Sequence, residues 1–288
     1  MRWNGLMGLA LALLLGGWGS AGGAAELKLS TWNLDWLTLR AASDAELPAD
    51  VHPKQAADLA VLRRYAADLA ADVVALQEVD GPTAAATVFP PDRYVLHMTG
   101  DDVVQRVGFA VRKGLAFTAN PDLASLDPPH SHLRSGADIT LHWAGGDLRL
   151  LAVHLKQGCR QEKLTDRTRP ACPILRGQLA ALRDWVAQRR AEGGAFVLMG
   201  DFNRWMDGDD AFYATLRQDG ALSRATEGRS SPCWGGGGFI DHIIAGGAAR
   251  DWLEADTLRV LVYRETGEEW RDRLSDHCPV SVRLALPE

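Results

Sequence analysis

Residues 196–203 read FVLMGDFN, four apolar residues followed by Gly-Asp-Phe-Asn. The apolar run comes after Gly193-Gly194, a pair typical of a helix end, and it has the length of a short strand. Asp201 and Asn203 lie at the end of that strand. Because α/β proteins place their functional side chains at strand ends, this stretch predicts an α/β fold with a polar site at one sheet edge.

Other segments carry strand or helix patterns. Strands are expected at Leu27–Trp32, Val73–Leu76, Tyr94–Met98, Val107–Val111, Asp138–Trp143, Leu148–His154, Phe239–Ile244, Leu258–Val262 and Pro279–Leu284. Gly145-Gly146 separates two of them and predicts a β-hairpin. Apolar residues at helical spacing predict helices from Pro53 to about Ala70 and from Ile174 to about Arg190. Without repeats or linkers, the pattern predicts one α/β (α+β) domain at 26–288.

The N-terminus has the pattern of a secretory signal peptide. Arg2 precedes the apolar run Leu6–Leu15, and small residues follow as far as Ala25. The run is too short to span a bilayer, which takes about 20 residues. We expect a signal peptide at 1–25, cleavage after Ala25, and a secreted or periplasmic protein without stable membrane insertion. An uncleaved anchor is the alternative.

The composition is that of an ordinary globular protein. Of 288 residues, 47% are hydrophobic and 24% are charged, which excludes a disordered chain, a coiled coil and a collagen. The formal net charge of −6 argues against a protein held on nucleic acid by bulk charge alone. A local basic groove stays compatible with this balance.

Polar residues follow or end several of the expected strands. They are Asn33, Asp35, Glu78, His154, Lys156, Asp201, Asn203, Asp241, Asp276 and His277. Most of these side chains offer oxygen, few offer nitrogen, and none is a thiolate. Oxygen-rich sites suit Mg²⁺, Mn²⁺ or Ca²⁺ rather than Zn²⁺. Closely packed carboxylates also repel one another unless a cation lies among them, so the sequence predicts a metal-binding site suited to phosphate-ester hydrolysis.

Six short motifs occur in order along the chain: TWNLDW, LQEVD, HLK, GDFN, IDHI and SDHCPV, from Thr31 to Val280. This series resembles the endonuclease/exonuclease/phosphatase superfamily, the group that includes proteins similar to DNase I and exonuclease III. The resemblance implies a four-layer sandwich, in which two mixed β-sheets pack face to face and helices flank them. It places the site at one edge of the sandwich.

The resemblance also implies roles for the metal-binding residues. Glu78 is expected to be the first metal ligand, with Asn33 beside it and Asp276 sharing the site. Asp35 matches a position near the metal, where it either binds the ion or supports a ligand. The expected cofactor is Mg²⁺, with Mn²⁺ or Ca²⁺ as alternatives.

The expected catalytic residues are His154, Asp201, Asn203, Asp241 and His277. Asp201 would orient or deprotonate the attacking water, and Asn203 would hold that water or a phosphate oxygen. Asp241 would pair with His277 and favour an imidazolium that contacts the phosphate. His154 would contact phosphate or protonate the leaving group. His242, next to Asp241 on the strand, should point to the opposite face and be structural.

Two basic side chains are candidates for substrate binding. Lys156 follows His154 in the HLK motif, and Arg106 stands just before the Val107 strand. A solvated residue at a strand end is the competing interpretation for Arg106. Between His154 and Gly177 six basic residues face two acidic ones, which is typical of a polyanion clamp or of a solvated charged loop.

The four cysteines, Cys159, Cys172, Cys233 and Cys278, suggest two disulfide bonds in a secreted protein. Pairing of Cys159 with Cys172 would close a short loop. Pairing of Cys233 with Cys278 would staple the site from behind if their strands are neighbours. Sequence alone does not fix the connectivity, so both pairs are hypotheses.

These observations favour a secreted, metal-dependent phosphodiesterase, a hydrolase that acts as a nuclease (an endonuclease) on extracellular DNA or RNA. A lipid phosphodiesterase similar to bacterial sphingomyelinases, or a phosphomonoesterase, would use the same core with a different substrate. A non-catalytic binding module is the third hypothesis. We expect a monomer with nucleic acid as substrate and no protein partner.

Overall fold

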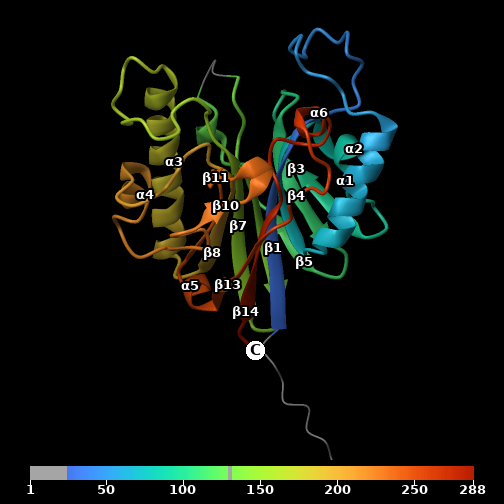
Figure 1. The fold of residues 1–288 in the computed structure, drawn as a ribbon. Coiled ribbons are helices and arrows are strands. Elements are labelled where there is room, and N and C mark those ends of the chain that lie inside the picture. The colour runs from blue at the N-terminus through green and yellow to red at the C-terminus, as the bar shows by residue number, and fades with distance from the viewer. Residues whose placement is uncertain (1–24, 129–131) are drawn as a thin grey trace, which may run out of the picture.

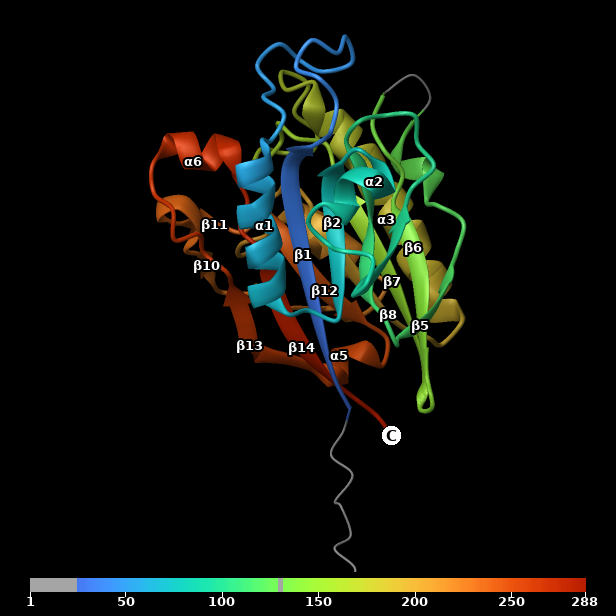
Figure 2. The same cartoon turned by 90° about the vertical axis from the view of Figure 1, so that its right-hand side faces the viewer.

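The computed structural model describes residues 25–128 and 132–288. Two six-stranded sheets pack face to face, with α3 covering the outer side of one sheet and α1 the outer side of the other (Figures 1 and 2). The predicted four-layer sandwich is therefore confirmed. The proposed signal peptide lies outside the described residues except for Ala25, where the first strand begins.

The first sheet has the order β13-β14-β1-β2-β4-β3. Its strands are β1 (Ala25–Leu37), β2 (Val73–Val79), β3 (Tyr94–Met98), β4 (Arg106–Arg112), β13 (Leu253–Val260) and β14 (Val280–Leu286). β1 and β2 are parallel, and the other neighbours are antiparallel. β1 continues past the expected end at Trp32, so Asn33 and Asp35 lie within the strand.

The second sheet has the order β5-β6-β7-β8-β12-β9. Its strands are β5 (Ala116–Ala119), β6 (Ala137–Trp143), β7 (Gly146–His154), β8 (Ala195–Asp201), β9 (Ser223–Arg224) and β12 (Asp241–Gly246). The β6–β7 hairpin turns at Gly145-Gly146 as predicted. β7 and β8 are parallel, so both carry their carboxyl ends to the same sheet edge.

Helices cover the sheets and short elements connect them. They are α1 (Ala56–Leu69), α2 (Gly81–Ala86), α3 (Ala171–Ala191), α4 (Ala211–Leu216), α5 (Ala249–Trp252), α6 (Glu268–Arg273), the 3₁₀ turns η1 (Ala124–Leu126) and η2 (Cys233–Gly235), and the strand pair β10 (Ser230–Ser231) and β11 (Gly237–Gly238). α1 begins at Ala56, not at the predicted Pro53, because the Asp58 carboxylate accepts the Gln55 N–H at 2.9 Å and fixes the first turn there.

The cores follow the two-residue period of the strands. In β8, Val197 and Met199 pack between the sheets, whereas Phe196 and Leu198 pack beneath α3. In β1, Leu27 and Leu29 point into the same central layer. Both faces of these strands are therefore buried, which explains why they are nearly continuous apolar runs.

The same alternation brings polar side chains together at one edge. Asn33, His154, Asp201 and Asp241 occupy inward-facing positions of β1, β7, β8 and β12. His154 is paired in register with Asp201, and Asp201 is paired with Asp241. This edge is the upper one in Figure 1.

All four cysteines are paired, Cys159 with Cys172 and Cys233 with Cys278, as hypothesised. The premise of neighbouring strands does not hold, since β12 and β14 belong to opposite sheets. The second bridge instead ties η2 to the segment before β14 across the open edge. No helix among the described residues combines the length and apolarity that crossing a bilayer requires.

Candidate active site

Two adjoining cavities open at this edge. The first, which we call the acidic cavity, has a volume of about 280 Å³, and its walls include Asp35, Glu78, Arg134, His154, Asp201 and Lys156. The second, of about 260 Å³, is lined by Arg160, Trp205, Arg271 and Gly236–Gly238, and we call it the glycine cavity. Gln157, Asn203, Asp276 and His277 line both. The two cavities therefore form one continuous depression, which has His277 and Asn203 at its centre.

Unusual backbone conformations direct several of these side chains. Asp35, Trp36, Glu78 and Asn203 all have positive φ, which is uncommon for residues other than glycine. The register of β2 shifts between Leu76 and Val79 against the neighbouring strands. This irregularity turns Glu78 into the cavity instead of the outer layer, which strict alternation would give it. Such strained positions concentrate at functional sites.

Gly200 of the GDFN motif allows the close approach of β8 and β7. Its φ is +148°, and a Cβ at this position would lie 2.0 Å from the carbonyl oxygen of Val153. Any other residue would push the two strands apart. The glycine therefore sets the separation of Asp201 from His154, whose nearest side-chain atoms are 3.5 Å apart.

Asp201 is fully buried and lies at the centre of a hydrogen-bond network. Its Oδ1 accepts the Asn203 backbone N–H at 2.7 Å. Its Oδ2 accepts from the side-chain amides of Asn203 and Asn33 at 3.0 and 3.2 Å. Burial raises the pKa of Asp201 to about 7, against the opposing charge of His277. The group is thus held in one orientation and is poised to exchange a proton near neutral pH.

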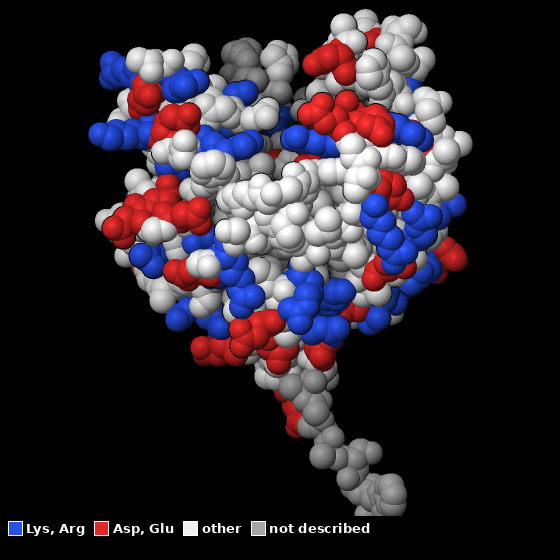
Figure 3. Space-filling view, in the orientation of Figure 1, with Lys and Arg blue, Asp and Glu red and all other residues white. Residues whose placement is uncertain are grey.

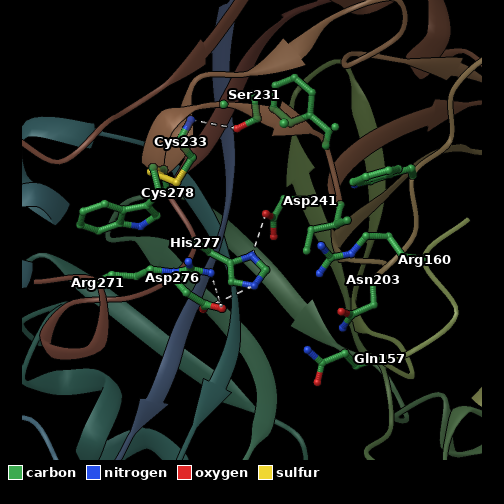
Figure 4. Close-up of a pocket in the computed structure, with 17 residues that line it drawn as sticks. Gln157, Arg160, Asn203, Ser231, Cys233, Asp241, Arg271, Asp276, His277 and Cys278 are labelled. Atoms are coloured by element: carbon green, nitrogen blue, oxygen red, sulfur yellow. Dashed lines mark hydrogen bonds and ion pairs between the residues drawn. A yellow bond between two sulfur atoms is a disulfide. The ribbon is translucent and has the colours of Figure 1, made fainter. Parts of the chain in front are cut away.

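Asp241 and His277 form the predicted pair. Oδ2 of Asp241 lies 2.8 Å from Nδ1 of His277 (Figure 4). Nε2 of His277 lies 3.7 Å from Oδ2 of Asp201. Burial alone would lower the pKa of His277, but the Asp241 and Asp201 carboxylates outweigh burial and hold this pKa well above its usual value. The ring is therefore an imidazolium at neutral pH, suited to contact with a phosphate oxygen.

His154 is buried beside a cation that sequence reasoning missed. Nη2 of Arg134 lies 3.0 Å from Nε2 of His154. Because a guanidinium can only donate, Nε2 accepts and the ring proton lies on Nδ1. Burial, and then the charge of Arg134, lower the pKa of His154 well below its usual value. A neutral ring whose Nε2 accepts from Arg134 and whose Nδ1 is buried fits neither a leaving-group acid nor a direct phosphate contact, and it instead orients the guanidinium.

The carboxylates of Asp35, Glu78 and Asp276 all line the acidic cavity. Burial raises the pKa of Asp35 to about 6, the charges of Asp276 and Glu78 add to the rise, and Lys54 opposes it. This mutual repulsion is what a divalent cation relieves, and carboxylate oxygens suit Mg²⁺, Mn²⁺ or Ca²⁺. The residues present therefore fit a hard metal ion. Asp201, Asp241 and His277 form a second group with ligand atoms within 4.8 Å of one another.

The hydrogen bonds of the Asn33 side chain do not fit the metal ligand that the sequence suggested. Its oxygen accepts the Asp35 backbone N–H at 2.9 Å, and its amide nitrogen donates to Glu78 at 3.0 Å and to Asp201. The side chain therefore holds two carboxylates in place and presents its nitrogen to them. An amide nitrogen is a donor and does not bind a metal ion.

The two basic residues that were candidates for substrate binding differ in their position relative to the cavities. Lys156 lines the acidic cavity, but Arg106 lines neither cavity. The Arg106 Nε donates to the Val103 carbonyl at 3.1 Å, because β4 begins at this residue and directs its side chain back along the preceding loop. The phosphate contact suggested for Arg106 is therefore not supported.

His242 points to the outer layer of the sandwich, as expected. Its Nδ1 is hydrogen-bonded to the Thr226 hydroxyl at 2.6 Å, and burial lowers its pKa to about 3.

Three side chains that contact site residues were not predicted from the sequence. Arg134 is buried beside His154, and Gln105 donates to Glu78. Lys54 is buried too, and its Nζ donates to the Asp35 carbonyl at 2.7 Å. All three lie in loops outside the six motifs. A cue for Arg134 was its place just before a predicted strand, which is the position that drew attention to Arg106.

Comparisons with known proteins agree with this geometry. The model of the endonuclease/exonuclease/phosphatase family matches residues 30–277. No curated protein matches the chain in sequence.

Solved structures share the fold at low sequence identity. Truncated TDP2 from Caenorhabditis elegans is 16% identical with a TM-score of 0.61, over 90% of this chain and 98% of that one. A 3′ phosphatase, NExo, from Neisseria, bound to a product DNA hairpin, is 20% identical with a TM-score of 0.56, over 90% and 99%. The AP endonuclease from Leishmania major is 14% identical with a TM-score of 0.57, over 91% and 88%. At these identities the likeness shows the fold alone.

Proposed function

The chain belongs to the endonuclease/exonuclease/phosphatase family, whose members are metal-dependent phosphoesterases and nucleases, and we propose that it is a secreted phosphodiesterase that cleaves nucleic acid as an endonuclease. One observation carries the catalytic part of this proposal. A buried carboxylate with a pKa of about 7 (Asp201) faces a charged imidazolium (His277) at 3.7 Å, beside a group of carboxylates suited to a metal ion.

The chemistry proposed for these residues is hydrolysis by in-line attack of water. Asp201 accepts the proton of the attacking water. The two amide N–H groups of Asn203 are donated to Asp201 and to the Leu155 carbonyl, so its Oδ1 accepts from that water. Nε2 of His277 donates to a phosphate oxygen and stabilises the extra negative charge of the transition state. Arg134, which also lines the acidic cavity, supplies a second positive charge, with His154 orienting its guanidinium.

The carboxylates of Glu78, Asp35 and Asp276 would hold the metal ion, with Mg²⁺ as the first candidate. The chemistry that a divalent ion supplies in such a place is neutralisation of phosphate charge and of the developing charge on the leaving oxygen. Asn33 and Gln105 donate to Glu78 and hold that carboxylate in position.

Nucleic acid is the substrate that the surroundings of the site favour. Lys156 and Arg160 reach the two cavities from the basic segment after β7, in a chain whose net charge is −6. Local positive charge on an acidic protein attracts a polyanion to this place rather than to the whole surface. Among the structural neighbours, the Neisseria phosphatase was solved with a DNA hairpin.

Secretion is the part of the proposal that concerns location. Two disulfide bonds fit an oxidising compartment outside the cytosol. The signal-peptide pattern at residues 1–25 would provide the route. Expression of the full chain with its N-terminus, followed by N-terminal sequencing of the exported protein, tests the cleavage after Ala25.

A panel assay of the purified protein tests the function. Plasmid DNA, single-stranded DNA, RNA, sphingomyelin vesicles and 4-nitrophenyl phosphate are incubated with Mg²⁺, Mn²⁺, Ca²⁺ or EDTA. We expect metal-dependent cleavage of nucleic acid that is lost in Asp201→Ala and in His277→Ala. Turnover of sphingomyelin alone, or of the monoester alone, would change the proposed substrate but leave the proposed hydrolytic mechanism in place. A folded, metal-loaded protein that turns over nothing would favour a binding module.

A further inference from the structure

We propose that the glycine cavity is a binding subsite for one unstacked nucleotide next to the scissile phosphate, and that the protein therefore acts on single-stranded nucleic acid. This inference rests on the proposed phosphodiesterase function. The glycine cavity adjoins the acidic cavity through His277 and Asn203, so a group attached to a phosphate held there must enter it.

Positive charge lies on two opposite sides of the glycine cavity. Arg160 and Arg271 approach it from opposite sides, with His277 between them (Figure 4). Arg271 is half-exposed and only weakly paired, with its Nη2 3.9 Å from Asp276. Figure 3 shows Lys and Arg side chains on both sides of the hollow in this face. A phosphate that follows the scissile one along a nucleic-acid strand would find a guanidinium on either side.

Two indole rings provide flat apolar surface in the same cavity. Trp205 lies under Arg160, whose guanidinium carbon is 5.8 Å from the ring centre. Trp234 is stacked on Tyr263 at 5.3 Å and is fixed by a hydrogen bond from its Nε1 to the Ser275 carbonyl at 2.9 Å. Because both rings are already held, they can stack a base or pack a sugar without first being ordered.

The floor of the cavity is made of glycines that keep it open. A Cβ on Gly237 would meet no atom within 4 Å. A Cβ on Gly238 would instead lie 2.9 Å from the Trp205 ring, which shows how closely that indole packs on the floor. The absence of side chains at 236–238 therefore creates both the volume and the place of one indole.

Disulfide bonds fix both walls. Arg160 directly follows Cys159, whose carbonyl accepts from Arg204 at 3.0 Å. On the other wall, the Cys233–Cys278 bridge joins the residue before Trp234 to the residue after His277. The subsite is thus rigid before any ligand arrives, and rigid aromatic walls favour affinity by reducing the entropy lost on binding.

The shape of the subsite distinguishes single strands from duplexes. A cavity of about 260 Å³ with guanidinium groups on two sides and indoles in its walls takes a base that has left its stack. A base within a duplex remains stacked and paired, and extracting it costs a few kcal/mol. A flexible single strand does not carry that cost.

Gly237→Leu is the test variant, because Gly237 lines the subsite and is not one of the catalytic residues. Gly177→Leu, on the exposed face of α3 where a Cβ also meets no atom within 4 Å, is the matched control. Both are assayed on a fluorescent single-stranded oligonucleotide, on the same strand in a duplex, and on bis(4-nitrophenyl) phosphate. Binding of the single strand is measured by fluorescence anisotropy in EDTA.

We expect wild type and Gly177→Leu to cleave the single strand at least about tenfold faster than the duplex, in line with the energy of base stacking on an indole. Gly237→Leu should lose that preference and bind the single strand about tenfold more weakly. Arg160→Ala should weaken single-strand binding in the same direction.

Equal cleavage of single strand and duplex by wild type, or unchanged binding by Gly237→Leu, would overturn the subsite. Hydrolysis of sphingomyelin vesicles that Gly237→Leu abolishes would assign the cavity to a lipid headgroup and also overturn it. Failure of the proposed function has a different signature, since bis(4-nitrophenyl) phosphate would then stay intact with every metal. The anisotropy measurement still decides the subsite in that case.

Discussion

Nδ1 of His277 lies 2.8 Å from Oδ2 of Asp241, although the two residues belong to opposite halves of the sandwich. Asp241 is the first residue of β12 in one sheet, and His277 stands before β14 in the other. Their hydrogen bond therefore crosses the open edge between the sheets. It couples the charge of the imidazolium to the packing of the two sheets.

Asp241→Asn should remove the charge that keeps His277 protonated. The pKa of His277 is raised, so phosphate contact by the imidazolium is present below that pKa and is lost as the pH rises through it. In the variant, this falling limb of the pH–rate profile moves to lower pH, and kcat at pH 7 falls roughly 100- to 10,000-fold. Rates on bis(4-nitrophenyl) phosphate between pH 5 and 10 measure both effects. Asp256→Asn, an exposed carboxylate, is the control, and an unmoved limb would contradict the assignment.

Arg134→Gln should be far more damaging than Arg106→Gln. The Arg134 guanidinium lies in the acidic cavity beside His154, whereas Arg106 lines neither cavity. Removing a preorganised donor to the transition state costs on the order of 100- to 1,000-fold in kcat. We expect such a loss for Arg134→Gln and less than a threefold change for Arg106→Gln, measured as kcat/KM on DNA and on bis(4-nitrophenyl) phosphate. Comparable losses in the two variants would show that the sequence-based choice of Arg106 was sound.

Metal binding should displace a proton from the acidic cavity. Because the pKa of Asp35 is raised to about 6, this carboxyl is protonated below that pH and must lose its proton when a cation binds. The affinity for Mg²⁺ should therefore be highest above pH 7 and fall by up to about tenfold for each pH unit below 6. Calorimetry in two buffers of different ionisation enthalpy counts the released protons. Asp35→Asn should bind more weakly with a flatter pH dependence, and an equally steep dependence would exclude Asp35.

The central strands could be predicted because the residues within each strand are enough to identify it. β8 and β2 are buried on both faces, and a short run of apolar residues is enough to identify them. β5 was missed, since it is a mostly exposed edge strand without such a run. The ends of β1 and β2 were also missed. Their last residues pair through a shifted register, which strict alternation does not predict.

The candidate site was likewise predictable only in part. That Asp201, Asp241 and His277 lie close together could be predicted, because motifs at strand ends meet wherever strands share an edge. The partners of these residues could not. Arg134 reaches His154 from a loop, and Lys54 reaches Asp35 from the loop before α1, so only the packed structure brings each pair together. Loop positions follow no period from which a side chain's direction can be deduced.

The two disulfide bonds should differ in what their loss does to the enzyme. Cys233 and Cys278 are separated by 45 residues, and Cys159 and Cys172 by 13. In the chain-entropy model these loops correspond to about 4 and about 3 kcal/mol of stability, so replacing the first pair by serines should lower the free energy of unfolding more. Urea denaturation of the two double variants gives this comparison.

The same variants separate stability from catalysis. Cys278 adjoins His277, and Cys233 adjoins Trp234 of the glycine cavity. Loss of this pair should reduce kcat on bis(4-nitrophenyl) phosphate even at 15 °C, where the variant is still folded, because the imidazolium is no longer held against Asp241. Loss of the Cys159–Cys172 pair frees the loop that carries Arg160, and it should raise KM for a single-stranded oligonucleotide with kcat on the small diester unchanged. If loss of Cys233–Cys278 changed only KM for the oligonucleotide and loss of Cys159–Cys172 changed kcat on the small diester, the bridges would stabilise the fold without positioning the walls of the glycine cavity.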